Sequence, residues 1–190
     1  MAGRLLVATP MIADANFERT VVALLDHGDE GSLGLVLNRP SDTTVVDPLP
    51  EWDRFAVHPA VVFLGGPVQQ ERAIALARPS AGHRTGDPDG AGVLDDAFDA
   101  VVGDIGTLDL HVDPDRVGAA IDQVRVFSGY AGWGPGQLEG ELEAGAWWVV
   151  DARPDDLLCE APEQLWRGVL ARQPGDLATF ARYPDDPSAN

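Results

Sequence analysis

The sequence predicts a single α+β domain in which a mixed, strongly curved β-sheet carries a few packed helices. Short apolar segments rich in β-branched residues outnumber segments with helical periodicity, and helices interrupt the strands irregularly. The lack of a regular strand–helix alternation disfavours a doubly wound parallel sheet. A chain of 190 residues, 45% of them apolar, suits one domain with a substantial core. We expect the domain at 1–175, with a loop excursion at 79–99 and a C-terminal tail at 176–190.

The predicted strands are short apolar segments bounded by Gly, Pro, Asn or Asp. In chain order they lie at 4–8, 20–27, 33–38, 60–64, 72–77, 107–111, 124–127 and 146–151. Gly28 and Gly31 suit a hairpin loop between the second and the third. Pro40 is expected to end the third strand, because proline has no backbone N–H to donate to a ladder.

Three segments carry helix signals. Asp113 and Pro114 suit a helix start, with Asp as N-cap and Pro at the first helical position. Leu138 and Leu142 lie four residues apart after a glycine-rich turn, so they share one apolar face. Pro162 starts a last helix. The buried face of that helix is expected to consist of Leu165, Trp166, Val169 and Leu170.

The remaining segments read as loops. The region 41–59 is a loop with a turn of helix around 50–55. Pro, Gly and Asp dominate 79–92, which leaves that segment nothing to bury. Residues 93–102 fit no single pattern, and the chain after Gly175 is expected to fray.

Charge restricts the classes of function. The chain has 31 acidic and 13 basic residues, a net charge of −18, and every basic residue is Arg. Such a domain repels a phosphate backbone at long range, so direct nucleic-acid binding is disfavoured. The absence of Lys excludes a Walker P-loop, a protein kinase and a Schiff-base enzyme, each of which needs a lysine amine.

Other features favour a cytoplasmic protein. No apolar run approaches the roughly 20 residues that span a bilayer. The first apolar run is shorter than a secretory core of about 7–15 residues. Cys159 is the only cysteine, so an internal disulfide is impossible, which fits a reducing compartment.

The stretch Ser128–Trp148 holds three of the five Trp and six of the 21 Gly, and reads as strand, turn, helix and strand. A dinucleotide fingerprint would lie at such a turn, but its third Gly is replaced by Gln137. Ser128 lacks the G-x-S-x-G spacing of a nucleophile elbow. Glu139 and Glu143 form one row on the helix, which we interpret as a solvated acidic face rather than a paired-carboxylate site.

The sequence offers no metal or cofactor motif. The four His have no ligand spacing, and the acidic residues between 95 and 122 lack the EF-hand pattern. We therefore expect no obligate metal and no cofactor, assign no catalytic residue, and favour a non-enzymatic protein over an enzyme.

One ligand-binding hypothesis rests on turns that follow strands. Asn38, Arg39 and the Gly65-Gly66 turn can offer backbone amides and one guanidinium to a small acidic ligand. The turn after Ser128 would supply the other wall. The proposed residues are Asn38, Arg39, Gly65, Gly66, Gly132, Trp133, Gly136 and Gln137. The alternatives are ordinary turn chemistry for the glycines and a core position for Trp133.

Five motifs occur in the order seen in one known family. LLVATP with MIADANFERTVV, EGSLGLVLNRP, FLGGPV, GYAGWGPGQLEGEL and WW resemble the YqgE/AlgH family between about residues 4 and 172. The resemblance implies a bacterial cytoplasmic protein whose curved sheet closes into a pseudo-barrel. Members are commonly labelled transcriptional regulators. The resemblance implies no established catalytic residue, cofactor or DNA-binding element.

We therefore expect a regulatory protein that acts through a protein or small-ligand partner rather than by binding DNA directly. The alternative is a small-molecule-binding protein or an unrecognised enzyme, with a cleft formed by 38–40, 65–68 and 132–137. A third interpretation is that the motifs specify only an unusual fold.

Overall fold

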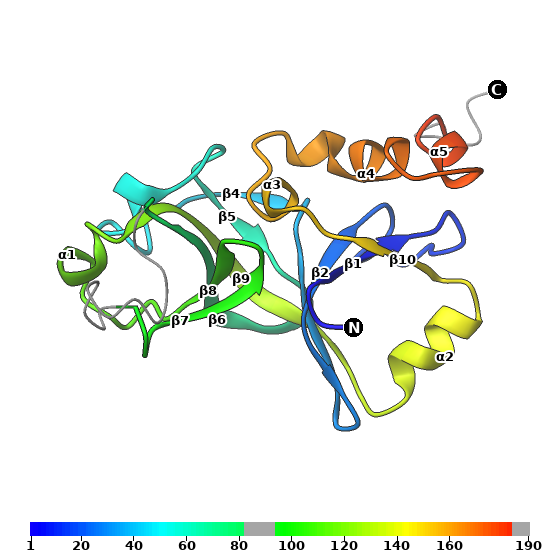
Figure 1. The fold of residues 1–190 in the computed structure, drawn as a ribbon, viewed down its shortest axis with the longest axis horizontal. Coiled ribbons are helices and arrows are strands. Elements are labelled where there is room, and N and C mark those ends of the chain that lie inside the picture. Colours follow the sequence, from blue (N-terminus) through cyan, green and yellow to red (C-terminus); the bar gives the residue numbers. More distant parts are fainter. Residues whose placement is uncertain (82–93, 184–190) are drawn as a thin grey trace.

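The computed structural model describes residues 1–81 and 94–183. It is built around one strongly curled sheet of ten strands, which forms an open half-barrel (Figure 1). The strands are β1 Arg4–Ala8, β2 Val21–Gly28, β3 Gly31–Val36, β4 Pro40–Thr44, β5 Val61–Leu64, β6 Val68–Pro79, β7 Phe98–Val102, β8 Ile105–Leu108, β9 Ile121–Trp133 and β10 Trp147–Asp151. Their order is β10-β1-β2-β3-β9-β6-β8-β7, and β5 joins β4 to β9. The predicted α+β class with a mixed, curved sheet is confirmed, since β5 and β9 pair in parallel and the other ladders are antiparallel.

β9 organises this sheet. It is 13 residues long and pairs with β3, β5 and β6. Its last residues, from Ser128 on, are also the first residues of the stretch Ser128–Trp148, which we call the Trp-rich stretch. The Trp-rich stretch is therefore a direct continuation of the longest strand. The sequence predicted only 124–127 here, because the Gly and Ser residues that follow interrupt the apolar pattern, although β9 continues to Trp133 with a register shift against β6 between Ser128 and Tyr130.

The helices are short and lie outside the half-barrel. They are α1 Pro114–Val117, α2 Gln137–Glu143, α3 Pro154–Leu157, α4 Pro162–Ala171 and α5 Leu177–Phe180, with a 3-10 turn at Asp53–Phe55. Helices α3, α4 and α5 follow one another along one side of the sheet, and α2 lies apart from them (Figure 1). None of the helices in the described parts of the chain has the length and apolar character needed to cross a bilayer.

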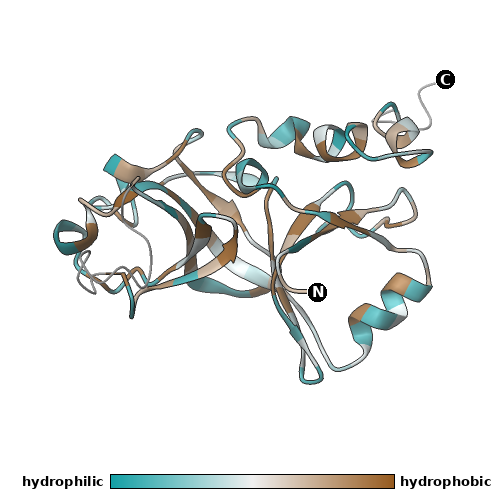
Figure 2. Cartoon of the chain, in the orientation of Figure 1, coloured by the Kyte–Doolittle hydropathy of each residue, from teal (hydrophilic) through white to brown (hydrophobic). Residues whose placement is uncertain are grey.

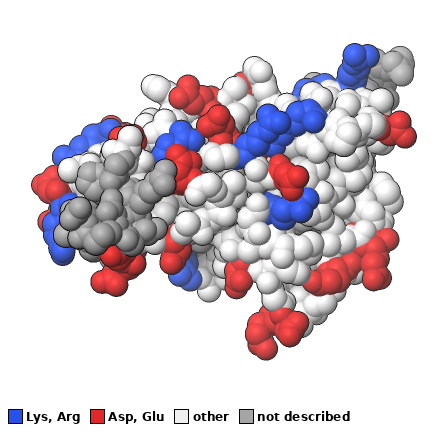
Figure 3. Space-filling view, viewed as in Figure 1, with Lys and Arg blue, Asp and Glu red and all other residues white. Residues whose placement is uncertain are grey.

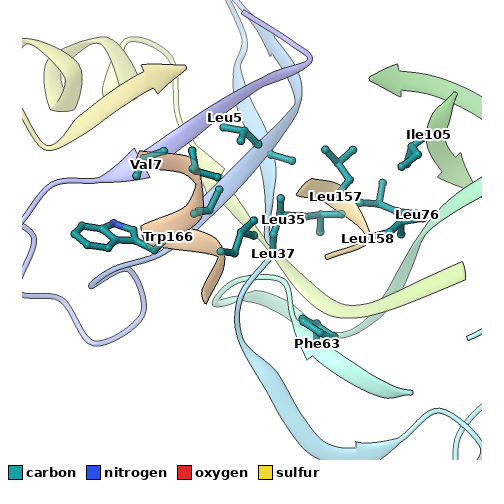
Figure 4. Packing of buried hydrophobic residues seen from close by; sticks show 14 of the residues in the cluster. Leu5, Val7, Leu35, Leu37, Phe63, Leu76, Ile105, Leu157, Leu158 and Trp166 are labelled. Atoms are coloured by element: carbon teal, nitrogen blue, oxygen red, sulfur yellow. The ribbon is translucent and has the colours of Figure 1, made fainter. Parts of the chain in front are cut away.

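Among the described residues the buried side chains form three clusters, and the largest of them fills the space between the sheet and α3–α4. Figure 4 shows Leu5 and Leu35 from the sheet facing the same interior as Leu157 and Trp166. The predicted buried face of α4 is confirmed, because its four apolar residues are all buried. The colouring of Figure 2 shows the same division, with brown residues on the sheet side of α4 and teal residues on its other side. Burial of one such side chain contributes about 1.5–3 kcal/mol.

Several expectations need correction. Residues 40–44 form an edge strand rather than a loop, and Pro40 pairs with Phe63. An edge strand accepts proline as its first residue, because the missing N–H faces away from the ladder. The loop excursion at 79–99 ends earlier than expected, since β7 starts at Phe98. Residues 82–93 of that excursion lie outside the described residues.

The expected tail at 176–190 is folded over its first residues. Helix α5 follows Gly175, and the ring of Phe180 lies 4.8 Å from that of Trp148. Tyr183 also packs against the main core cluster. Contacts of these partly buried aromatic rings outweigh the polar composition that suggested fraying. Residues 184–190 lie outside the described chain.

A buried cation lies at the centre of the sheet. Arg125 of β9 is 2% exposed, and its two terminal nitrogens donate to the carbonyls of Cys159 (2.5 Å) and His58 (2.6 Å). Its guanidinium also lies 4.3 Å from the ring centroid of Phe63. Burial lowers the pKa of Arg125 to about 10. This side chain joins three distant segments, and we assign it a structural role.

Candidate functional site

The structure does not bring the eight predicted site residues together in one cleft. Asn38 and Arg39 line a cavity beside α4, whereas Gly132 and Trp133 line a different one near the tip of the β2–β3 hairpin. The remaining four residues have turn or packing roles, described next.

Gly65 and Gly66 allow two strands to approach closely. The N–H of Gly65 donates to Ser128 (2.9 Å), and its carbonyl accepts from Val36 (2.8 Å). A Cβ on Gly66, which has a φ of 153°, would lie 2.1 Å from the carbonyl carbon of Tyr130. The backbone groups of this turn are therefore used within the sheet, as the alternative of ordinary turn chemistry predicts.

Trp133 is a core residue, as the alternative interpretation of the sequence expects. It is 6% exposed, and its indole N–H donates to Glu141 Oε2 (2.9 Å). The indole of Trp147 donates to the same oxygen (2.8 Å), and Phe17 packs against both rings. Gln137 completes the network by donating to Glu141 Oε1 (3.0 Å). One carboxylate thus links the two ends of the Trp-rich stretch. We call Trp133, Gln137, Glu141 and Trp147 the Glu141 network.

The turn before α2 uses two of its backbone donors internally. Gly136 has a φ of 73°, a left-handed conformation that favours glycine. The N–H of Gly134 donates to the side chain of Gln137 (3.1 Å), and the N–H of Gln137 donates back to the carbonyl of Gly134 (3.1 Å). These two N–H groups are therefore used within the turn.

The strongest candidate site is a cavity of about 260 Å³ between the 38–40 segment and α4, which we call the arginine cleft. Three guanidinium groups and one indole line it, together with one carboxylate. Its residues are Arg19, Asn38, Arg39, Pro40, Glu163, Trp166 and Arg167. Guanidinium groups bind carboxylates and phosphates with paired hydrogen bonds, so this set of side chains is suited to an anion.

Asn38 fixes the shape of the cleft. Its Nδ2 donates to the carbonyl of Arg19 (2.9 Å), and its Oδ1 accepts from the N–H of Val21 (2.9 Å). Arg19 has a φ of 53°, which is uncommon for a residue with a side chain. The Asn38 amide therefore holds a strained segment against the start of β2 and sets where the Arg19 side chain emerges.

An aromatic wall supports the first guanidinium. The guanidinium carbon of Arg19 lies 5.2 Å from the ring centroid of Trp166 and 5.9 Å from that of Tyr183. Trp166 is fixed in turn, because its indole N–H donates to the carbonyl of Ala8 (2.9 Å). A smaller cavity of about 50 Å³ lies on the other side of Arg19 and shares Trp166 with the cleft.

Arg39 and Arg167 reach the cleft from different elements, Arg39 from the segment before β4 and Arg167 from α4. Arg39 is half-buried and donates to the carbonyls of Glu18 and Asn38. Burial lowers the pKa of Arg39, and the nearby charge of Glu18 partly opposes that shift. Arg167 donates to the carbonyl of Ala181 (3.0 Å), which ties the cleft to the segment after α5.

The charge of the cleft contrasts with the rest of the surface. The chain carries −18, and Figure 3 shows acidic side chains over α2 and the tip of the β2–β3 hairpin. Several basic side chains gather on the α3–α5 side. Glu163 is the one carboxylate in the cleft, and it lies four residues before Arg167 on α4.

Sequence reasoning identified Asn38 and Arg39 but missed Arg19, Trp166 and Arg167 as neighbours of them. Trp166 carried a signal only for burial on α4. Arg167 follows it directly, so it lies at the border of the buried face, which is a weak signal for a lining position. In residues 1–81 and 94–183, no three His, Cys, Asp or Glu lie close enough to hold a metal ion.

Comparisons with known proteins agree on one family. A sequence model of the family described as AlgH-like, DUF179, matches residues 5–178. The chain is 52% identical over 190 residues to the UPF0301 protein SCO2948 of Streptomyces coelicolor, covering 100% of this chain and 95% of that protein. It is 43% identical over 189 residues to a UPF0301 protein of Mycobacterium avium, covering 100% and 90%.

Two solved structures have the same fold. Protein DIP2367 from Corynebacterium diphtheriae has a TM-score of 0.86 at 27% identity, over 96% of this chain and 92% of that one. The AlgH protein from Pseudomonas aeruginosa has a TM-score of 0.67 at 30% identity, over 97% and 94%.

Proposed function

The chain belongs to the AlgH-like family, DUF179, and we propose that it is a regulatory protein that binds a small anion in the arginine cleft. In this proposal the protein responds to a small-ligand partner in the bacterial cytoplasm. It is neither an enzyme nor a direct DNA-binding protein.

One observation carries the proposal. Three of the 13 Arg of a chain with net charge −18 line one cavity of about 260 Å³. A cation costs free energy when it is removed from water, and the lowered pKa of the half-buried Arg39 indicates that cost. A bound anion would offset it by supplying an opposite charge at hydrogen-bonding distance.

The same cleft favours binding over catalysis. Apart from Glu163, its lining residues are Arg, Asn, Pro and Trp, none of which is a common nucleophile or general base. The overall charge argues against direct contact with DNA, because a surface at −18 repels phosphates at long range. A mobility-shift titration at low salt should therefore show no complex.

Isothermal titration with inorganic phosphate and with succinate tests the proposal at low ionic strength. Arg39→Gln should lower the affinity for the tighter-binding of the two anions by roughly 10-fold, about the effect of one lost charge-assisted hydrogen bond. Arg39→Lys should give an intermediate value, because it keeps the charge and loses the fork geometry. Glu163→Gln should tighten binding by roughly 3-fold, because it removes a like charge from the cleft.

Arg116→Gln is the matched control, because Arg116 is an exposed guanidinium on α1, remote from α4 (Figure 1). Thermal melts of every variant show whether the fold is retained. Equal affinities for the protein and its Arg39→Gln and Arg116→Gln variants, or no heat with either anion, would overturn the proposal.

A further inference from the structure

A second cavity, separate from the arginine cleft, is lined by residues of β4, β5, β6 and β9. It has a volume of about 340 Å³ and a largely apolar floor, formed by Val62, Leu64 and Val126, with Leu49 as one wall. Leu64 is 44% exposed, although its neighbour Phe63 is fully buried. We call this cavity the β4–β5 groove.

A distortion of β6 builds the opposite rim of the groove. Val68 pairs with Tyr130 and Ala73 pairs with Ser128, so residues 69–72 of β6 stand opposite one residue of β9. Gln69 has a φ of 47°, and the hydroxyl of Ser128 donates to the carbonyl of Gln70, which holds the bulge in place. Backbone strain of this kind is retained where the surrounding structure fixes it, and it is concentrated at functional sites.

The bulge presents two opposite charges to the groove. Glu71 and Arg72 are adjacent and exposed, and both line the cavity. Within the described residues neither side chain has an ion-pair partner. An apolar floor beside one carboxylate and one guanidinium is complementary to a molecule that carries an ammonium, a carboxylate and an apolar group.

We propose that the β4–β5 groove binds a free apolar α-amino acid. Its carboxylate pairs with Arg72, its ammonium pairs with Glu71, and its side chain lies on Val62, Leu64 and Val126. The carboxylate of an apolar acid would be repelled by Glu71, and the ammonium of an apolar amine would be repelled by Arg72. A zwitterion has an opposite charge for each of the two side chains, so it fits the groove best. The groove volume of about 340 Å³ falls within the range of small-molecule sites, so an amino acid of the size of leucine or phenylalanine can enter it.

The two sites lie at successive positions of one strand. Pro40 lines the arginine cleft, and the following residues Ser41 and Thr43 line the groove. The sites nevertheless share no lining residue, so each can be changed without the other. Failure of one proposal therefore leaves the other standing.

Isothermal titration with L-phenylalanine, 3-phenylpropionate and phenethylamine tests the groove in the full chain. Phenylalanine should bind, and each analogue should bind roughly 10-fold more weakly, because each lacks one charged hydrogen-bonding group. Arg72→Gln should remove the preference for phenylalanine over phenethylamine. Glu71→Gln should remove the preference over 3-phenylpropionate.

Leu64→Asp and Val46→Asp form a matched pair for the apolar floor. Both residues are exposed apolar side chains, at 44% and 46%, but Val46 is not among the residues that line the groove. Leu64→Asp should weaken phenylalanine binding by roughly 10-fold or more, and Val46→Asp should leave it unchanged. Equal binding of all three compounds, no binding of phenylalanine, or equal effects of the two substitutions would overturn the proposal.

Discussion

Replacement of Glu141 by alanine should lower the free energy of unfolding by more than is usual for a residue on a short surface helix. The carboxylate Oε2 accepts the indole N–H groups of Trp133 (2.9 Å) and Trp147 (2.8 Å), which are 6% and 5% exposed. Truncation leaves both donors buried and unpaired. Each such group costs about 1–3 kcal/mol, so Glu141→Ala should lower the free energy of unfolding by about 3 kcal/mol.

Glu141→Gln separates the loss of charge from the loss of the acceptor. Its amide oxygen can still accept from both indoles, but its NH2 group replaces the oxygen that accepts from Gln137, so we expect a cost of about 1–2 kcal/mol from the lost charge and that lost bond. Glu143→Ala is the matched control on the same helix, because Glu143 is exposed, and it should change stability by less than about 0.5 kcal/mol. Denaturant unfolding followed by tryptophan fluorescence gives all three values.

A double-mutant cycle with Trp133→Phe would then isolate one of the two bonds. The coupling energy should be about 1–2 kcal/mol, since phenylalanine keeps the ring and loses the donor. If Glu141→Ala lowers the free energy of unfolding no more than Glu143→Ala does, the Glu141 network does not stabilise the Trp-rich stretch, and the reasoning is refuted.

Two further predictions concern the buried Arg125 and Cys159. Arg125→Met should cost about 2 kcal/mol, since two carbonyls lose a charged donor while a buried charge is removed, and Arg125→Ala should cost about 2 kcal/mol more through the cavity that it leaves. Burial lowers the pKa of Arg125 to about 10, so above that pH the unfolded chain binds more protons than the folded protein. The free energy of unfolding of the protein, relative to that of Arg125→Met, should therefore rise between pH 9 and 11. A difference in free energy that does not change with pH would contradict this. Burial raises the pKa of the Cys159 thiol, so Ellman's reagent should react with it at pH 8 more slowly than after unfolding in urea, and a faster reaction in the folded state would refute that assignment.

Much of the fold could be predicted because local patterns and tertiary packing agree. The strands Arg4–Ala8 and Trp147–Asp151 pair with each other and have the predicted bounds to within one residue. Helices α1, α2 and α4 start at the predicted signals of Asp113-Pro114, the Gly-rich turn and Pro162. β4 could not be predicted, because its polar sequence is stabilised by one partner strand rather than by burial of its own side chains.

The candidate site was harder to predict because long-range packing assembles it. Arg19, Arg39 and Arg167 come from three distant segments, and neither periodicity nor a motif links them. Within the Trp-rich stretch, the spacing of Gln137 and Glu141 on one helix face is visible in the sequence, but their role depends on two indoles supplied by the flanking strands. Local pattern therefore identifies the elements, and only the fold identifies which polar groups face one another.

The most direct test of anion binding in the arginine cleft is an NMR titration of the five tryptophan indole N–H signals with inorganic phosphate. The indole of Trp166 lines the cleft beneath Arg19, whereas those of Trp133 and Trp147 are held by Glu141 outside it. Binding in the cleft should shift the Trp166 signal in a saturable way and leave the Trp133 and Trp147 signals unchanged. In the Arg39→Gln variant, the shift of the Trp166 signal should be absent. A Trp166 signal that does not move, or one that moves equally in Arg39→Gln, would contradict the proposed site.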